Sequence, residues 1–151
     1  MAVDVTTEIE IARPRGEVAA FAADPDNAQA WYENIQHVEW RTPKPLAVGS
    51  QVAFVAQFMG RRLAYTYEIT ELVPGERLVM RTTTGAFPME TTYTWASTPD
   101  GGTRMTLRNR GQPKGFARIG ATMMTRAMRK ATTKDLQQLK ELLEARPAPT
   151  A

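Results

Sequence analysis

The 151-residue sequence contains no cysteine and only one histidine, His37. Without cysteine, the chain can form no disulfide, no cysteine-ligated zinc or iron–sulfur site and no thiol nucleophile. A single histidine also excludes a histidine-rich metal site and a Cys/His dyad. The sequence has neither a G-x-S-x-G elbow nor a phosphate-binding glycine loop. We therefore predict no metal and no cofactor.

Long hydrophobic runs are also missing. No stretch approaches the roughly 18 apolar residues that a membrane span requires, and the first residues show neither a basic leader nor an apolar signal region. We expect a soluble, cytoplasmic protein without membrane insertion. The length suits a single domain, which we place at residues 1–146. Residues 147–151 are rich in proline and have little to bury, so they predict a disordered tail.

Charge is distributed unevenly, although the formal net charge is only +3. Residues 1–40 hold eight acids and two arginines, whereas residues 101–134 hold nine bases and no acid. Such asymmetry can mark an anionic partner. The bases alternate with apolar residues, however, which is equally typical of the solvated faces of a strand and a helix. We do not expect nucleic-acid binding, because the positive charges lack a matching stacking platform.

The hydrophobic pattern has three parts. Residues 3–11 alternate apolar and polar side chains, which predicts a strand, and Pro14 and Asp24-Pro25 then each open a short helix. From residue 35 to residue 110, segments of alternating residues are separated by glycine- and proline-rich turns, as in an antiparallel meander. The period becomes helical from about Lys114 to Ala145, with curvature or a break expected near Gly120.

This order of elements leaves the single apolar face of the sheet to be covered by the only large amphipathic helix, so we predict an α+β fold. Several motifs, in matching order, resemble the SRPBCC superfamily, in particular its polyketide cyclase/dehydrase-type and START-like members. The resemblance covers nearly the whole chain. The matching motifs are Ile9-x-Ile11-x-x-Pro14, Asp24-Pro25 followed by Trp31, Pro45-Leu46-x-x-Gly49, Tyr67-Glu68-Ile69-Thr70-Glu71, Gly101-Gly102-Thr103-Arg104 and Asp135-Leu136-x-x-Leu139.

The resemblance implies a helix-grip fold. In this fold, a seven-stranded antiparallel sheet wraps around a long C-terminal helix, two short helices follow the first strand, and an apolar cavity lies between sheet and helix. Aromatic residues on facing strands and methionines on the helix are the candidate lining, although ordinary core packing is the more common role of any single one of them. The predicted ligand-binding residues are Trp31, Phe54, Phe58, Tyr65, Tyr67, Phe87, Tyr93, Trp95, Phe116, Met123, Met124 and Ala127.

Catalytic candidates are few. Tyr65, Tyr67 and Tyr93 could stabilise an enolate, and Arg81 could pair with an anionic group if it points inward. His37 shares a strand face with charged residues, which indicates solvent exposure rather than a general base. An enzyme would therefore be a cofactor-independent cyclase or dehydratase.

Three functions are compatible with the sequence. The first is binding of a small hydrophobic ligand, aromatic, polyketide-like or lipid-like, with or without cyclase or dehydratase activity. The second is a non-catalytic carrier of lipids or metabolites. The third is a protein-interaction module similar to the chaperone-ATPase activators of the superfamily, in which the basic C-terminal region meets an acidic partner. A homodimer also remains open.

Overall fold

The computed structural model describes residues 3–85, 87–112 and 120–147. Seven strands form one antiparallel sheet in the order β1-β7-β6-β5-β4-β3-β2. The strands are β1 (Val3–Ile11), β2 (Ile35–Trp40), β3 (Gln51–Phe58), β4 (Arg61–Val73), β5 (Arg77–Thr84), β6 (Met89–Ser97) and β7 (Thr103–Gly111). The helices are α1 (Arg15–Ala23), the 3₁₀ turn η1 (Pro25–Asn27), α2 (Ala28–Trp31) and α3 (Ala121–Glu144).

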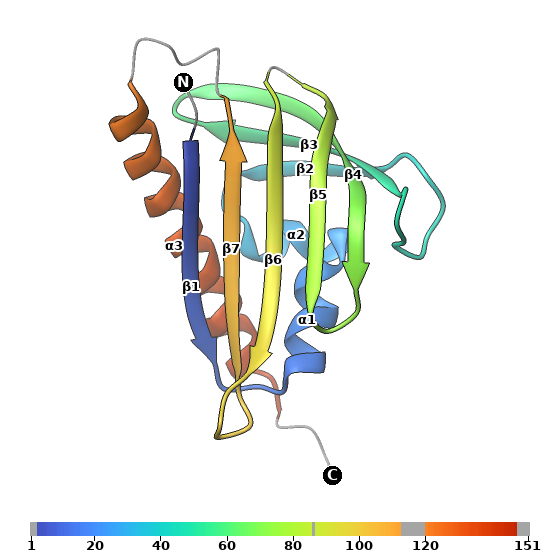
Figure 1. Cartoon of the computed structure of the whole chain (residues 1–151), viewed down its shortest axis with the longest axis vertical. Coiled ribbons are helices and arrows are strands. Elements are labelled where there is room, and N and C mark those ends of the chain that lie inside the picture. The colour runs from blue at the N-terminus through green and yellow to red at the C-terminus, as the bar shows by residue number, and fades with distance from the viewer. Residues whose placement is uncertain (1–2, 86, 113–119, 148–151) are drawn as a thin grey trace.

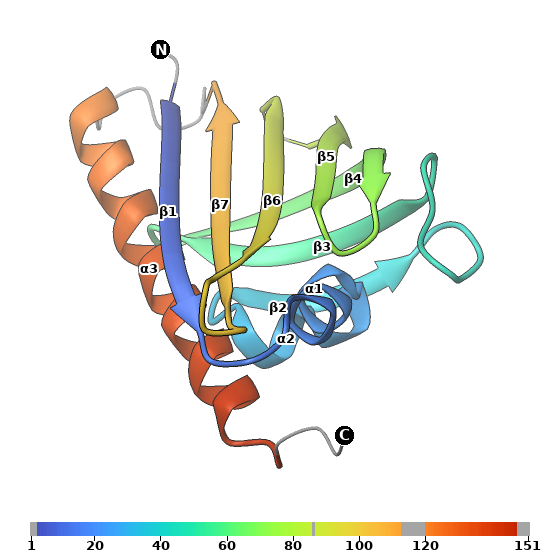
Figure 2. The same cartoon turned by 60° about the horizontal axis from the view of Figure 1, so that its bottom comes forward.

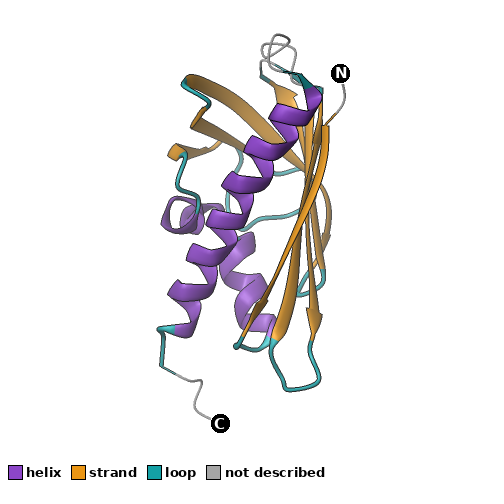
Figure 3. Ribbon diagram, turned by 90° about the vertical axis from the view of Figure 1, so that its left-hand side faces the viewer, coloured by secondary structure: helices purple, strands orange, loops and turns teal. Residues whose placement is uncertain are grey.

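The sheet bends around the long helix. Figures 1 and 2 show β2 and β3 turned away from the direction of β1, β7 and β6, and Figure 3 shows α3 lying along the inner face of the sheet. The short helices α1 and α2 close the space between α3 and the sheet at one end. The α+β helix-grip fold with two short helices after the first strand is therefore confirmed. No helix within the described ranges is long and apolar enough to cross a membrane.

The short helices begin where the local chemistry predicts. The Asp24 carboxylate accepts a hydrogen bond from the Asp26 backbone N–H at 2.9 Å, and Pro25 takes the first position of η1. The long helix begins at Ala121, directly after Gly120. Gly120 has a φ of +82°, a conformation that other residues rarely adopt. The described part of the predicted helix thus starts next to Gly120. The expected break stays a prediction, because residues 113–119 lie outside the described ranges, as do residues 148–151.

The uneven charge distribution is explained in part by strand pairing. The acid-rich strand β1 lies beside the base-rich strand β7, and the two pair in register from Val3↔Gly111 to Ile11↔Thr103. Arg108 is 2.6 Å from Asp4, and Arg104 is 3.1 Å from Glu10. These β7 bases, which suggested an anionic partner, lie on the exposed outer face of the sheet, as the alternative interpretation expected, and they have acidic neighbours there.

The helix α3 holds the free edge of β1. Arg129 donates a hydrogen bond to the backbone carbonyl of Thr6 at 3.1 Å, and Lys140 donates to that of Glu10 at 2.9 Å. A strand edge with unpaired carbonyls is a template for aggregation, and positive side chains block it. On the inner side, Leu136, Leu139 and Leu143 of α3 are at most 1% exposed, which contributes roughly 1.5–3 kcal/mol for each leucine.

The C-terminal end of α3 is fixed to the junction between β1 and α1. The Arg13 guanidinium donates to the backbone carbonyl of Glu144 at 2.8 Å and also to that of Arg146. In return, the Glu144 carboxylate accepts the Ala12 backbone N–H at 2.8 Å. These contacts satisfy carbonyls that a helix end leaves without intrahelical partners.

Replacing Arg13 with alanine is expected to lower the free energy of unfolding by about 1–3 kcal/mol, because charged hydrogen bonds to the helix end are lost. Urea denaturation measures this change. Arg15→Ala is the matched control. Among the described residues the Arg15 side chain makes only an exposed ion pair of 3.6 Å with Glu76, so its loss should change stability by less than about 1 kcal/mol. Equal effects of the two variants would contradict the anchoring role of Arg13.

Candidate functional site

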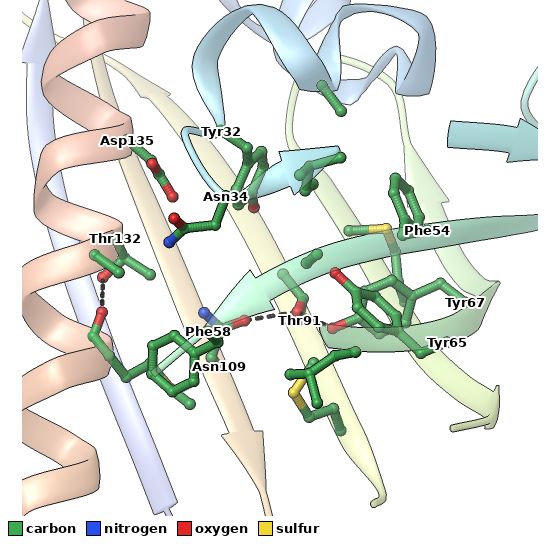
Figure 4. A pocket seen from close by; sticks show the side chains of 18 of the residues that line it. Tyr32, Asn34, Phe54, Phe58, Tyr65, Tyr67, Thr91, Asn109, Thr132 and Asp135 are labelled. Carbon is green, nitrogen blue, oxygen red and sulfur yellow. Dashed lines mark hydrogen bonds between the residues drawn. The ribbon is translucent and has the colours of Figure 1, made fainter. Parts of the chain in front are cut away.

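An internal cavity of about 140 Å³ lies between α2, α3 and the inner face of strands β3 to β7. Its wall is mostly apolar and aromatic, with polar side chains from β3, β4, β6, β7, α3 and the segment after α2 (Figure 4). An apolar cavity of about 150 Å³ is known to hold benzene. The cavity therefore has room for a single-ring molecule as it stands.

Aromatic rings form one wall of the cavity. Phe54 on β3 stacks on Tyr65 on β4 with ring centroids 5.7 Å apart and an interplanar angle of 25°. Tyr65 meets the edge of Tyr67 at 5.2 Å. On the α2 side, Trp31 lies 4.2 Å from the ring of Tyr32 and 5.8 Å from that of Tyr93. Flat faces on two sides favour a flat or ring-containing ligand.

Polar groups in the wall form two hydrogen-bonded sets. In the first, the Tyr67 hydroxyl donates to Thr91 Oγ1 at 2.7 Å, because the Thr91 proton is itself donated to Asn109 Oδ1 at 2.6 Å. This arrangement leaves the Asn109 amide nitrogen as a donor. In the second set, the hydroxyls of Tyr32 and Tyr93 share a short hydrogen bond.

The tyrosines of the cavity stay neutral. Burial raises the pKa of Tyr32, Tyr65, Tyr67 and Tyr93 above that of free tyrosine. They therefore act as hydrogen-bond donors and acceptors rather than as bases. The Tyr65 hydroxyl has no hydrogen-bond partner among the described residues, so it is available to a ligand.

Asp135 places a carboxylate in the wall of the cavity. It is 4% exposed, and its Oδ1 accepts the backbone N–H of Glu33 at 3.1 Å. Its Oδ2 has no hydrogen-bond partner among the described residues. Figure 4 shows the side chain pointing from α3 toward Asn34 and Tyr32. Burial raises the pKa of Asp135 to about 6, so the carboxylate is mostly ionised at neutral pH.

Most of the residues predicted to bind a ligand do line this cavity, although ligand contact itself stays a prediction. The lining ones are Trp31, Phe54, Phe58, Tyr65, Tyr67, Phe87, Tyr93 and Met124. Phe116 lies outside the described residues.

Three predicted residues do not line the cavity. Trp95 is buried, but it borders a surface groove beside α1, because it sits near the end of β6 that α1 covers. Met123 is 51% exposed, and Ala127 also lies outside the wall. The inward face of α3 instead carries Met124, Met128, Ala131 and Asp135, which recur at helical spacing. The predicted helix face was therefore rotated from the observed one.

Two catalytic candidates lie away from the cavity. Arg81 is exposed on the outer face of the sheet, where it contacts Glu90 at 2.5 Å. His37 is exposed on β2, as the alternation of its strand indicated. Tyr65 and Tyr93 remain as candidates, since both line the cavity.

Sequence reasoning missed Asp135, Asn109, Asn34 and Tyr32 as lining residues. Two of them carried a signal in the sequence. Asp135 lies four residues after Ala131 and four before Leu139, so an acidic side chain falls on the apolar stripe of the helix. Asn109 continues the inward series of Met105 and Leu107 on β7. Tyr32 and Asn34 follow α2 outside any periodic segment, and no pattern marks them.

A curved antiparallel sheet that grips one long helix around an internal cavity defines a START-like, helix-grip domain. The profile of the family described as polyketide cyclase/dehydrase and lipid transport matches residues 2–144. The chain therefore belongs to this family. No curated protein matches the sequence significantly.

Solved structures with the same fold share little sequence with this chain. A START superfamily protein from Mycobacterium smegmatis superimposes with a TM-score of 0.79 at 12% identity, covering 93% of this chain and 97% of that one. The Zhui aromatase/cyclase from a Streptomyces species gives a TM-score of 0.77 at 15% identity, with 95% and 94% covered. Protein TTHA0849 from Thermus thermophilus gives 0.79 at 19% identity, with 95% and 99% covered. At these identities the likeness shows the fold alone.

Proposed function

We propose that this protein binds a small hydrophobic, ring-containing molecule with oxygen or nitrogen substituents in the cavity between the sheet and α3. The observation that carries the proposal is the cavity wall itself. Aromatic faces on two sides suit a flat apolar body, and the Tyr65 hydroxyl and Asn109 amide offer hydrogen bonds to its substituents. Membership of a family that includes cyclases and lipid carriers supports the same class of ligand.

The volume of the cavity limits the ligand. Ligand sites usually measure about 300–1,000 Å³, whereas this cavity holds about 140 Å³. A single-ring molecule therefore fits without rearrangement. A multi-ring polyketide or a lipid chain would require α3 and the neighbouring strands to move apart.

A second candidate function is acid–base catalysis of the cyclase or dehydratase kind. The observation in its favour is Asp135, whose pKa of about 6 lets the carboxylate take up and release a proton near neutral pH. The neutral hydroxyls of Tyr65 and Tyr93 could donate hydrogen bonds to an enolate oxygen formed in the same cavity. A carrier would use the same cavity for reversible binding without turnover.

The test is a ligand titration that is monitored by calorimetry and by native mass spectrometry, with propylbenzene and 4-propylphenol as probes. We expect saturable one-to-one binding of both, with the phenol about threefold to tenfold tighter because of its hydrogen bonds to the wall. Incubation with poly-carbonyl compounds then separates a cyclase from a carrier. Absence of saturable binding by either probe, with the protein folded, would contradict the proposal.

A further inference from the structure

The cavity holds one charge, and that charge is negative. Asp135 is the only ionisable residue other than tyrosine among the described residues of the wall, and no lysine or arginine of the described chain lines it. Building on the ligand site proposed above, we propose that the cavity is selective for a protonated amine carried on a single-ring apolar body. The ammonium group would contact Asp135, and the ring would lie against the aromatic wall.

The Asp135 carboxylate has no counter-ion within the described part of the chain. A buried carboxylate is costly unless it is paired or fully hydrogen-bonded. Among the described residues Asp135 receives only the Glu33 backbone N–H, and its side chain borders both the cavity and the surface groove between α2 and α3. The nearest base on its own helix, Lys134, is exposed and pairs with the Glu33 carboxylate at 3.1 Å. The charge of Lys134 acts on Asp135, but no base of the described chain forms an ion pair with it, so an ammonium group in the cavity would be its first close positive partner.

The surroundings of the carboxylate also suit a cation. The negative charge of Asp135 contributes to the raised pKa of Tyr32, Tyr65 and Tyr93, so its field reaches these tyrosines. The faces of tyrosine and tryptophan rings attract cations. Trp31, Tyr32 and Tyr93 pack together on the α2 side of the cavity. The carboxylate and these aromatic rings line the same cavity, and both kinds of group favour a positive charge.

The same wall disfavours anions. An anionic ligand, such as a carboxylate or a phosphate ester, would be buried beside Asp135 with no cation among the described residues of the wall to pair with it. A neutral ligand would neither pair with the Asp135 carboxylate nor be repelled by it. The expected order of affinity is amine, then neutral molecule, then anion.

The experiment compares three ligands of similar size by calorimetry at pH 7.5, namely 2-phenylethylamine, propylbenzene and 3-phenylpropionate. We expect the amine to bind at least about tenfold more tightly than propylbenzene, and the anion at least about tenfold more weakly. Asp135→Asn should remove the preference for the amine and leave propylbenzene affinity within about threefold. Glu39→Gln, which removes an exposed charge of β2, should leave the order unchanged.

A pH series completes the test. The ionisable groups around Asp135 among the described residues lie on both of its sides. Tyr32 after α2, Tyr65 on β4 and Tyr93 on β6 lie on the cavity side. Glu33 and, on α3, Arg126, Arg129, Lys130, Lys134 and Glu141 line the surface groove that Asp135 also borders. Protonation of Asp135 below about pH 6 should weaken amine binding and leave propylbenzene unaffected. If propylbenzene binds and the amine binds no more tightly, this inference is overturned while the proposed ligand site stands. If no ligand binds, the ligand site itself is refuted.

Discussion

Replacing Ala131 with phenylalanine is expected to weaken ligand binding at least about 100-fold, because the new ring occupies the space that the ligand needs. Ala131 lines the cavity from the middle of α3, on the same face as Met124 and Asp135. The cavity measures only about 140 Å³, so it cannot hold a phenyl side chain and a single-ring ligand together. Titration with propylbenzene measures the effect.

Ala127→Phe is the matched control for this substitution. Ala127 lies one turn earlier on α3 but does not line the cavity, so the same change there should leave propylbenzene affinity within about threefold. Thermal melting of both variants shows whether they fold. Ala131→Met supplies a smaller change if the phenylalanine variant is unstable. Equal binding by wild type and Ala131→Phe would mean that the ligand lies elsewhere.

Replacing Asp135 with asparagine is expected to stabilise the folded protein at pH 8 by about 2–3 kcal/mol. Burial raises the pKa of this carboxyl from 3.8 to about 6, and each unit corresponds to about 1.4 kcal/mol. The folded state therefore holds the proton more tightly than the unfolded state, so ionisation of Asp135 lowers stability as the pH rises. Asparagine is of similar size and can still accept the Glu33 backbone N–H.

The sign of this effect gives it a clear pH dependence. The gain in free energy of unfolding of Asp135→Asn over wild type should be largest above the folded-state pKa of about 6. It should shrink toward pH 4, because the Asp135 carboxyl is then protonated in the folded state and about half protonated in the unfolded state. Urea denaturation between pH 4 and pH 8 measures it. Glu39→Gln, at an exposed site, should differ from wild type by less than about 0.5 kcal/mol throughout. A constant difference across this range would show that the Asp135 charge is not the cause.

The fold was predictable because its signals are local and repeated. Alternation along residues 3–11, turn residues between later strands and a helical period at the C-terminal end together fix the sequence of elements. Once these elements are known, α3 is the one long helix of the described chain that can cover the apolar face of the sheet. The pairing of β1 with β7 also agrees with their opposite charges, which the sequence displays as an acidic first part and a basic later part.

The details of the site were less accessible, since they depend on how elements are rotated and tilted against each other. Strand alternation placed Tyr65, Tyr67 and Tyr93 on the inner face, and they do line the cavity. On a helix, adjacent residues differ by about 100° in direction, so an error of one position separates the exposed Met123 from Met124, which lines the cavity. Trp95 on β6 shows what strand alternation cannot predict. Alternation predicts which face of the sheet a side chain lies on, but it does not predict how far along the strand that side chain lies from the cavity.

The position of β1 has a consequence for the order in which this protein can fold during synthesis. Its hydrogen-bonding partner β7 pairs Val3 with Gly111, and Lys140 of α3 contacts the Glu10 carbonyl 130 residues away in sequence. At about 5–20 residues per second, a ribosome takes roughly 5–20 s to make the first hundred of these residues. During that time β1 can pair neither with β7 nor with α3, because neither has been synthesised. Chaperone contact with the nascent N-terminal segment should therefore persist until β7 and α3 have emerged.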